Sequence, residues 1–284
     1  MPSSMVINTN IASLNSQKFL SRTTDSLQMS MERLSSGLRV NSAKDDAAGL
    51  AISDRMTSQI RGMTVAMRNA NDGISMAQTA EAGMGTITDT LQRMRDLAIQ
   101  AANRAAVGDG DRQKLQTEFL QLGQELNRII QNTEFNGKKI LFGSLAGANF
   151  QIGPNTGTDN QISVTVSNLA SVSGLRSIFG AGYSIGSGAT SGGVRSAIDQ
   201  IDIAISRVDT FRSNLGAIQN RFTMSIANLQ SSIANQSAAR SRIIDADFAA
   251  ETANLSRTQI LQQAGTAMLA QANQVTQGVL KLLQ

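Results

Sequence analysis

Apolar residues recur at alternating steps of four and three at both ends of this 284-residue chain. This heptad spacing predicts one narrow apolar stripe along each of two helices, the geometry of a coiled-coil seam rather than of a globular-core face. The N-terminal set is Leu20, Thr24, Leu27, Met31, Leu34 and Leu38. The C-terminal set is Leu261, Gly265, Met268, Ala272, Val275, Val279 and Leu282. Because neither helix can bury its own stripe, we expect both ends to pack against partners.

The two stripes could instead fold back on each other as an intramolecular hairpin. Burying a Leu or Val side chain stabilises by about 1.5–3 kcal/mol, but Gly265 and Ala272 dilute the C-terminal stripe. Ordering each residue costs about 1–2 kcal/mol of backbone entropy. A two-helix hairpin would also leave most helix flanks bare, so the composition favours packing between molecules.

The residue types present exclude several classes of enzyme. The chain has no His and no Cys, so a Ser-His-Asp or Cys-His nucleophile and the usual zinc sites are impossible. Asp45 and Asp46 are adjacent, and successive helical residues point about 100° apart rather than toward each other. They fit the N-terminus of a helix better than a catalytic carboxylate pair. We expect no catalysis, no cofactor and no metal; a Lys- or carboxylate-based enzyme is the weakest alternative.

Charge and hydropathy argue against nucleic acid and membranes as partners. The 25 basic residues are interleaved with 21 acidic ones, and aromatic residues make up 4% of the chain, so neither a basic stripe nor a stacking platform is present. No segment approaches about 18 uninterrupted apolar residues, so we expect no membrane insertion. The first 20 residues lack a basic segment followed by an apolar run, so we expect them not to be a cleavable secretory signal.

The remaining pattern predicts a mainly α fold, a long antiparallel helical bundle with terminal coiled-coil helices and a small β-hairpin insert. Ser36-Gly37 predicts a helix end, and Asn71-Asp72-Gly73 is typical of a turn by local rules. Alternating residues near 150–166 predict the hairpin. Residues 176–192 are rich in Gly and Ser, which is typical of a loop.

Several longer segments resemble bacterial flagellin, the subunit of the flagellar filament. They cover both terminal thirds of the chain in order, and their joint occurrence is far more specific than any one of them. The matching stretches include Val6-Ile7-Asn8-Thr9-Asn10, Asn41-Ser42-Ala43-Lys44-Asp45-Asp46-Ala47-Ala48-Gly49, Arg68-Asn69-Ala70-Asn71-Asp72-Gly73, Asp245-Ala246-Asp247-Phe248-Ala249 and Leu269-Ala270-Gln271-Ala272-Asn273-Gln274. The variable middle of the family is very short here, and translation could begin at Met1 or Met5.

The resemblance implies a secreted subunit that polymerises into the extracellular filament for swimming. Residues 1–44 and 244–284 would pair as the helices of an inner tube. Residues 45–175 and 193–243 would form the surrounding helical core domain, with 176–192 as a short variable outward loop. The family also implies a helix that continues through Asn71-Asp72-Gly73. Its partners would be other copies of the chain, an export chaperone, the filament cap and hook-junction proteins.

Two further roles follow from the resemblance. Arg93, Leu97, Leu115 and Glu118 match positions through which an innate-immune Toll-like receptor recognises similar flagellins, although the two leucines could simply be bundle residues. Each pair shares a helix face, so an Arg–Glu rim around two leucines is expected. The other role is possible O-glycosylation at Ser184, Ser187, Thr190 and Ser191. The alternative is that these residues belong to a plain flexible loop.

Two alternatives to a filament subunit are a hook–filament junction protein and a membrane-active secreted effector. The junction protein would share the terminal helices, but the dense match at both ends favours flagellin. The effector would need more hydrophobic helices with a Lys/Arg-rich polar face, whereas Gln, Asn, Ser and Thr occupy the non-seam positions here.

Overall fold

The computed structural model describes residues 9–143, 147–172, 175–179 and 182–282. The chain divides into two compact units. The terminal unit combines Met1–Ser58 with Ala234–Gln284, and the core unit comprises Gln59–Ile233. Val6, Ile7 and Asn8, which carry part of the family resemblance, and both candidate start residues lie outside the described residues.

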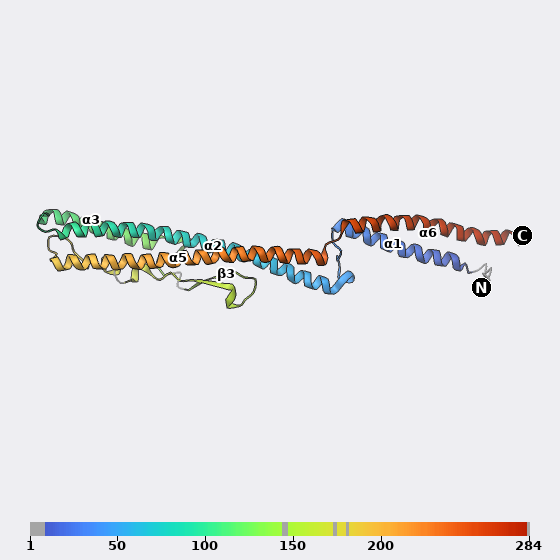
Figure 1. Ribbon diagram of the computed structural model, residues 1–284, viewed down its shortest axis with the longest axis horizontal. Coiled ribbons are helices and arrows are strands. Elements are labelled where there is room, and N and C mark those ends of the chain that lie inside the picture. Colours follow the sequence, from blue (N-terminus) through green and yellow to red (C-terminus); the bar gives the residue numbers. More distant parts are fainter. Residues whose placement is uncertain (1–8, 144–146, 173–174, 180–181, 283–284) are drawn as a thin grey trace. The chain divides into compact units, whose positions relative to one another are not determined.

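Long helices dominate both units (Figure 1), which confirms the mainly α expectation. The two longest, α2 and α5, each contribute to both units. The elements in chain order are α1 (Ile11–Ser36), α2 (Ala43–Ala102), α3 (Asp109–Asn132), β1 (Glu134–Phe135), β2 (Lys138–Lys139), β3 (Ala148–Gln151), β4 (Gln161–Val164), α4 (Leu175–Phe179), α5 (Ser191–Ile244) and α6 (Phe248–Leu282).

The core unit is an antiparallel bundle of α2, α3 and α5. Two polar contacts set the direction of α5 against α2: Arg95 pairs with Asp202, and Gln219 donates to Glu81 farther along. Both helices bury apolar residues at steps of three and four, as a bundle seam requires. The buried seam residues include Ala77, Ala80, Met84, Ile87, Leu91 and Met94 of α2 with Val194, Ala197, Ile201, Ala204 and Val208 of α5.

The turn predicted by local rules at Asn71-Asp72-Gly73 is wrong, because α2 continues through it as the family resemblance implies. A Cβ atom on Gly73 would lie 2.7 Å from Cζ of Phe222. Phe222 is fully buried, so its ring occupies the space that a side chain at position 73 would need. Gly73 therefore serves close helix packing and not a turn.

The expected β-hairpin is present as the antiparallel pair of β3 and β4. Phe150 lies opposite Ile162, and the register continues to Ala148 opposite Val164. The Phe150 ring meets Phe222 of α5 edge-on, with centroids 5.6 Å apart. A second, two-residue pair joins β1 to β2. The hairpin thus closes one side of the bundle core through aromatic contact.

In the terminal unit, α1 and α6 lie side by side in antiparallel directions (Figure 1). Gly37 ends α1 in the left-handed conformation, with φ of 73° and its N–H donating to the carbonyl of Arg33 at 2.8 Å. The chain then bonds back to the end of α5, where Ala246 N–H donates to the Gly37 carbonyl at 2.9 Å. The predicted helix end at Ser36-Gly37 is therefore confirmed.

Asp45 and Asp46 organise the start of α2. Asp45 accepts hydrogen bonds from the backbone N–H and the hydroxyl of Ser42, at 2.9 and 3.0 Å. Asp46 has non-helical angles, and its carboxylate accepts from the N–H of Gly49 at 2.8 Å. These bonds and the helix dipole hold both carboxylates as caps of the helix.

Candidate assembly surfaces

The apolar stripe predicted on α6 divides between two faces of the helix. Gly265 and Ala272 are half-buried in the terminal unit, whereas Leu261, Met268 and Val275 keep 51%, 62% and 61% of their surface exposed. An exposed Leu is ordinary on any protein, but three large apolar residues at heptad spacing that all stay more than half exposed are unusual. We call Leu261, Met268 and Val275 the open face of α6.

On α1, the predicted stripe mostly turns toward α6. Leu20, Leu27, Leu34 and Leu38 are half-buried, and Met31 is 48% exposed. The two ends therefore do pair within one chain, which was the alternative to packing between molecules. This pairing buries only one side of each helix. Val279 and Leu282 lie in α6, but their side chains fall outside the described ones.

Four exposed apolar residues of α1 lie outside the heptad stripe, so the sequence pattern did not single them out. They are Ile11, Leu14, Phe19 and Met29, which are 61%, 55%, 65% and 43% exposed. Phe19 lines a groove of about 430 Å³ between α1 and α6. The groove is also lined by Leu20, Leu261, Ala264, Gly265 and Met268.

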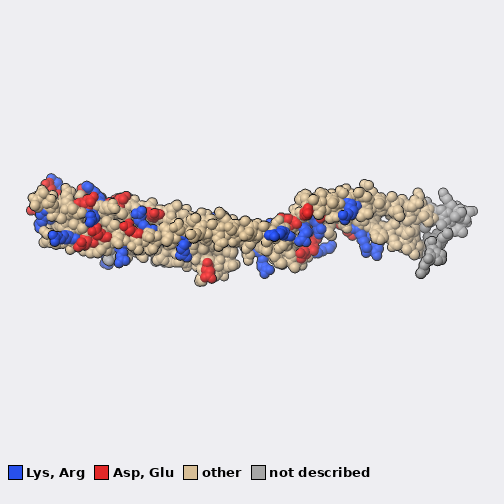
Figure 2. Space-filling view, viewed as in Figure 1, with Lys and Arg blue, Asp and Glu red and all other residues tan. Residues whose placement is uncertain are grey.

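Small residues and a few polar contacts hold the helix pair together. A Cβ on Gly265 would lie 3.4 Å from Cδ1 of Leu20, so the helices approach closely there. At one end, the Asn10 amide donates to the Ala272 carbonyl at 3.0 Å and its oxygen accepts from Ser13 N–H at 3.1 Å. Residues 258–280 contain no charged residue, and Figure 2 shows the visible face of this helix pair as mostly uncharged.

The structure brings together only part of the predicted receptor patch on the core unit. Both Nε and Nη2 of Arg93 donate to one carboxylate oxygen of Glu118, at 2.9 and 2.6 Å, and the two side chains are 55% and 43% exposed. Leu115 is half-buried beside the core. The expectation of two leucines inside the rim is wrong, because Leu97 is 1% exposed and belongs to the bundle core.

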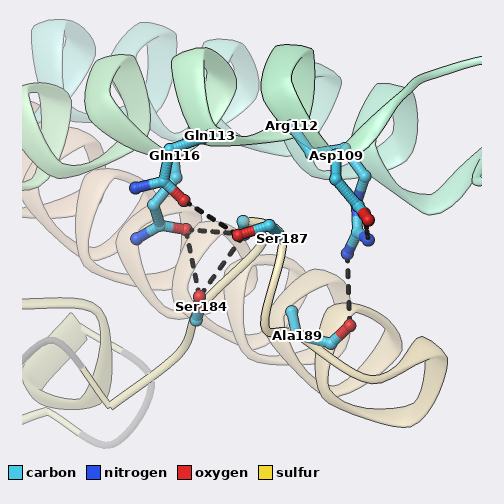
Figure 3. A network of polar contacts seen from close by, with 8 residues as sticks. Asp109, Arg112, Gln113, Gln116, Ser184, Ser187 and Ala189 are labelled. Atoms are coloured by element: carbon cyan, nitrogen blue, oxygen red, sulfur yellow. Dashed lines mark hydrogen bonds and ion pairs between the residues drawn. The ribbon is translucent and has the colours of Figure 1, made fainter.

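Residues 182–190, within the segment 176–192 expected as a short outward loop, are anchored to α3 (Figure 3). The side-chain oxygen of Gln116 on α3 accepts from the backbone N–H groups of Ile185 and Gly186, at 2.6 and 3.1 Å. Arg112, itself 1% exposed, donates to the Ala189 carbonyl at 3.2 Å. Because Ile185 is fully buried, one apolar side chain and three backbone bonds fasten the segment.

The four predicted glycosylation positions are all exposed, but their hydroxyls are engaged to different degrees. Ser187 donates to Gln113 at 3.3 Å, and Ser184 lies 3.5 Å from the Gln116 oxygen. Thr190 accepts from Gly193 N–H at 3.1 Å and so caps the start of α5. Ser191 is the first residue of α5. The anchoring contacts contradict the picture of these residues in a plain flexible loop.

Among the described residues, no group of three or more acidic side chains is placed to hold a metal ion. Within the same residues, no helix combines the length and apolarity that crossing a bilayer requires.

A helical core bundle and a terminal helix pair with an open apolar face are typical of a self-assembling structural subunit. Comparison with known proteins agrees. A family model described as the bacterial flagellin N-terminal helical region matches residues 7–146, and one for the C-terminal helical region matches residues 198–283. The chain belongs to the bacterial flagellin family.

Individual relatives match along nearly the whole chain. Flagellin of Halalkalibacterium halodurans is 43% identical over 280 residues, covering 99% of this chain and all of that one. Flagellin A of Vibrio cholerae is 38% identical over 376 positions, covering 98% of this chain and 99% of its own. Since that alignment exceeds 284 residues, this chain is a short form.

One solved structure supports the fold alone. A Vibrio parahaemolyticus chain described as a flagellar hook-associated protein is similar with a TM-score of 0.58 and 12% identity, covering 71% of this chain and all of that one. The family assignment makes this protein a structural subunit of the extracellular flagellar filament, which serves motility and is not an enzyme.

Proposed function

We propose that the α1–α6 pair is the surface along which copies of this chain pack into an inner tube. The observation that carries the proposal is the open face of α6, whose residues Leu261, Met268 and Val275 are more than half exposed. One partner helix covers only one side of α6, and the other side is apolar and lacks charge. Neighbouring subunits would bury it, which fits residues 1–44 and 244–284 as inner-tube segments.

The substitution Met268→Asp tests this placement. A charge buried between subunits without a partner costs several kcal/mol, and every subunit repeats the defect, so we expect no filaments. Met224→Asp is the matched control, because Met224 is 73% exposed on the core unit and should tolerate the charge. Negative-stain microscopy after salt-induced assembly reads the result. Normal filaments from Met268→Asp would contradict the proposal.

We further propose that the terminal segments order fully only on assembly, while residues 45–243, with the segment 176–192 on the outside, fold in the free subunit. The core unit supplies its own buried bundle, whereas the helix pair leaves large apolar residues exposed. Brief trypsin treatment should trim the free subunit to about residues 45–243 and spare the filament at the same sites. Equal cleavage of both forms would oppose this view.

A second candidate function is recognition of the free subunit by a Toll-like receptor. What favours it is the exposed Arg93–Glu118 pair beside Leu115, an accessible charged rim on the core unit. We expect Arg93→Ala to lower receptor-reporter stimulation at least about 10-fold, or about 1.4 kcal/mol. Arg128→Ala is the control, because Arg128 forms a similar exposed pair with Glu125 on the same helix α3. Equal signalling by both variants would remove the receptor claim.

The other proposed partners follow from the family and are tested by other means. They are an export chaperone, the filament cap and hook-junction proteins, and co-purification with each is the direct assay. A junction protein, the nearest alternative function, would give no long filaments under any assembly condition. Peptide mass spectrometry of filaments tests O-glycosylation at Ser184, Ser187, Thr190 and Ser191. N-terminal sequencing of the same filaments tests export without a cleaved peptide and distinguishes Met1 from Met5.

A further inference from the structure

Methionine is the only sulfur-containing residue type in this chain, which has twelve Met and no Cys. The described methionines fall into distinct classes of exposure. The buried ones, from 0% to 4% exposed, are Met63, Met76, Met84 and Met94. The exposed ones are Met29, Met31, Met224 and Met268, at 43%, 48%, 73% and 62%. Met56 and Met67 lie between these classes and are half-buried. Because thioether oxidation requires access of the oxidant, the exposed class is the most open to it in the free subunit.

Met268 differs from the other exposed methionines in its surroundings. It lines the groove between α1 and α6 together with Phe19 and Leu261, and it belongs to the open face. Met224 is at least as accessible, but it lies on α5 in the core unit, outside the helix pair. The chain therefore carries Met268 on the open face, Met29 and Met31 on the other helix of the pair, and the more exposed Met224 on the core unit.

We propose that Met268 is a reversible oxidation site through which hydrogen peroxide prevents free subunits from assembling. The proposal rests on the proposed function of the open face as an intersubunit surface. Oxidation turns a flexible apolar side chain into a polar, chiral one. Residues 258–280 contain no charged residue, so the helix itself supplies no cation that would offset the cost of burying the polar sulfoxide oxygen between subunits.

The reaction needs no group from the protein beyond the thioether. A sulfur lone pair attacks one peroxide oxygen, an S–O bond forms, and the O–O bond breaks. Sulfur loses two electrons, and the departing hydroxide takes up the remaining peroxide proton as water. Reduction by a dithiol, catalysed by sulfoxide reductases specific for each epimer, returns the thioether and releases water and a disulfide. The modification therefore blocks assembly without permanent damage.

Assembly should protect Met268 from oxidation by peroxide. Once neighbouring subunits cover the open face, peroxide no longer reaches Met268, whereas Met224 gains no cover from the helix pair. We expect Met268 and Met224 to oxidise at comparable rates in free subunits. In intact filaments Met268 should oxidise at least about 10-fold more slowly, since the rate follows access. Peptide mass spectrometry after matched peroxide doses measures both rates, and equal oxidation of Met268 in the two forms would overturn the proposal.

Two full-length variants isolate the effect of Met268 on assembly. The first carries Met29→Leu, Met31→Leu and Met224→Leu, which leaves Met268 as the one exposed methionine among the described residues. The second adds Met268→Leu. After peroxide, the first variant should need at least about 10-fold more protein to assemble, equivalent to about 1.4 kcal/mol, and the sulfoxide reductases should restore it. The second should assemble as before.

The outcomes separate the switch from the filament function itself. Unoxidised variants that assemble normally establish that the background is sound. If the first variant assembles unchanged after full oxidation of Met268, the oxidation proposal is wrong, and the filament function is unaffected. The same holds if peroxide reduces assembly equally in both variants. Failure of the unoxidised wild-type chain to form filaments under any condition would instead overturn the proposed function.

Discussion

Replacing Gln116 by Leu should release the 182–190 segment from α3 while leaving the bundle folded. The Gln116 oxygen is the acceptor for two backbone N–H groups, those of Ile185 and Gly186. Both bonds are buried, and leucine has nearly the same volume but no acceptor. The variant leaves Ile185 N–H without an acceptor and Gly186 N–H with only the Ser184 hydroxyl at 3.4 Å, and packing alone cannot compensate for this loss.

The size of the effect follows from the number of orphaned groups. An unsatisfied buried donor costs about 1–3 kcal/mol, which applies to Ile185 N–H if the segment stays closed. Gly186 N–H keeps the Ser184 hydroxyl at 3.4 Å and adds a smaller cost. Opening admits water and relieves both costs, whereas it exposes the buried Ile185 side chain in wild type and variant alike, so that term cancels. We therefore expect the free energy of local opening to fall by about 2–3 kcal/mol.

Native-state hydrogen exchange reads this opening directly. The amides of Ile185 and Gly186 should exchange about 30- to 150-fold faster in Gln116→Leu, as each 1.4 kcal/mol is a factor of ten. Gln113→Leu is the matched control one turn away, since Gln113 accepts only from the exposed Ser187 hydroxyl. It should change exchange less than about 3-fold. Equal exchange rates in the two variants would refute the anchoring role of Gln116.

The remaining predictions concern helix packing and pH. Gly73→Ala should destabilise the core unit by about 1 kcal/mol in urea unfolding. Overpacking against Phe222 costs about 1–3 kcal/mol, and the higher helix propensity of Ala offsets about 1 kcal/mol of this. Gly85→Ala, in the same helix with nothing within 4 Å of its Cβ, should stabilise instead. Hydrogen bonds from the backbone N–H and hydroxyl of Ser42 lower the pKa of Asp45. Its contribution to stability is present above the unfolded pKa, near 3.8, and disappears as pH falls through the lower folded value. Asp45→Asn should flatten acid unfolding in that window; an unchanged profile would contradict the assignment.

Local chemistry in the sequence was enough to determine most of the helices, the helix end at Gly37 and several excluded classes of enzyme. The alternating steps of four and three follow from about 3.6 residues per helical turn, so residue spacing alone predicted the stripes at both ends. Gly37 ends α1 as expected because only glycine adopts its left-handed angles without strain. The absence of His and Cys removed whole classes of enzyme by inspection.

Contacts between segments distant in the sequence decided the rest. The helix passes through Asn71-Asp72-Gly73 because the ring of Phe222, almost 150 residues later, needs the space at Gly73. The burial of Leu97 could not be predicted from the sequence either, because it depends on distant segments. The same is true of the hydrogen bond from Ile185 N–H to Gln116. The heptad pattern on α6 predicted a stripe, but the position of α1 determined that Gly265 faces inward and Met268 outward. Periodicity is a property of one helix, whereas burial depends on which neighbour covers it.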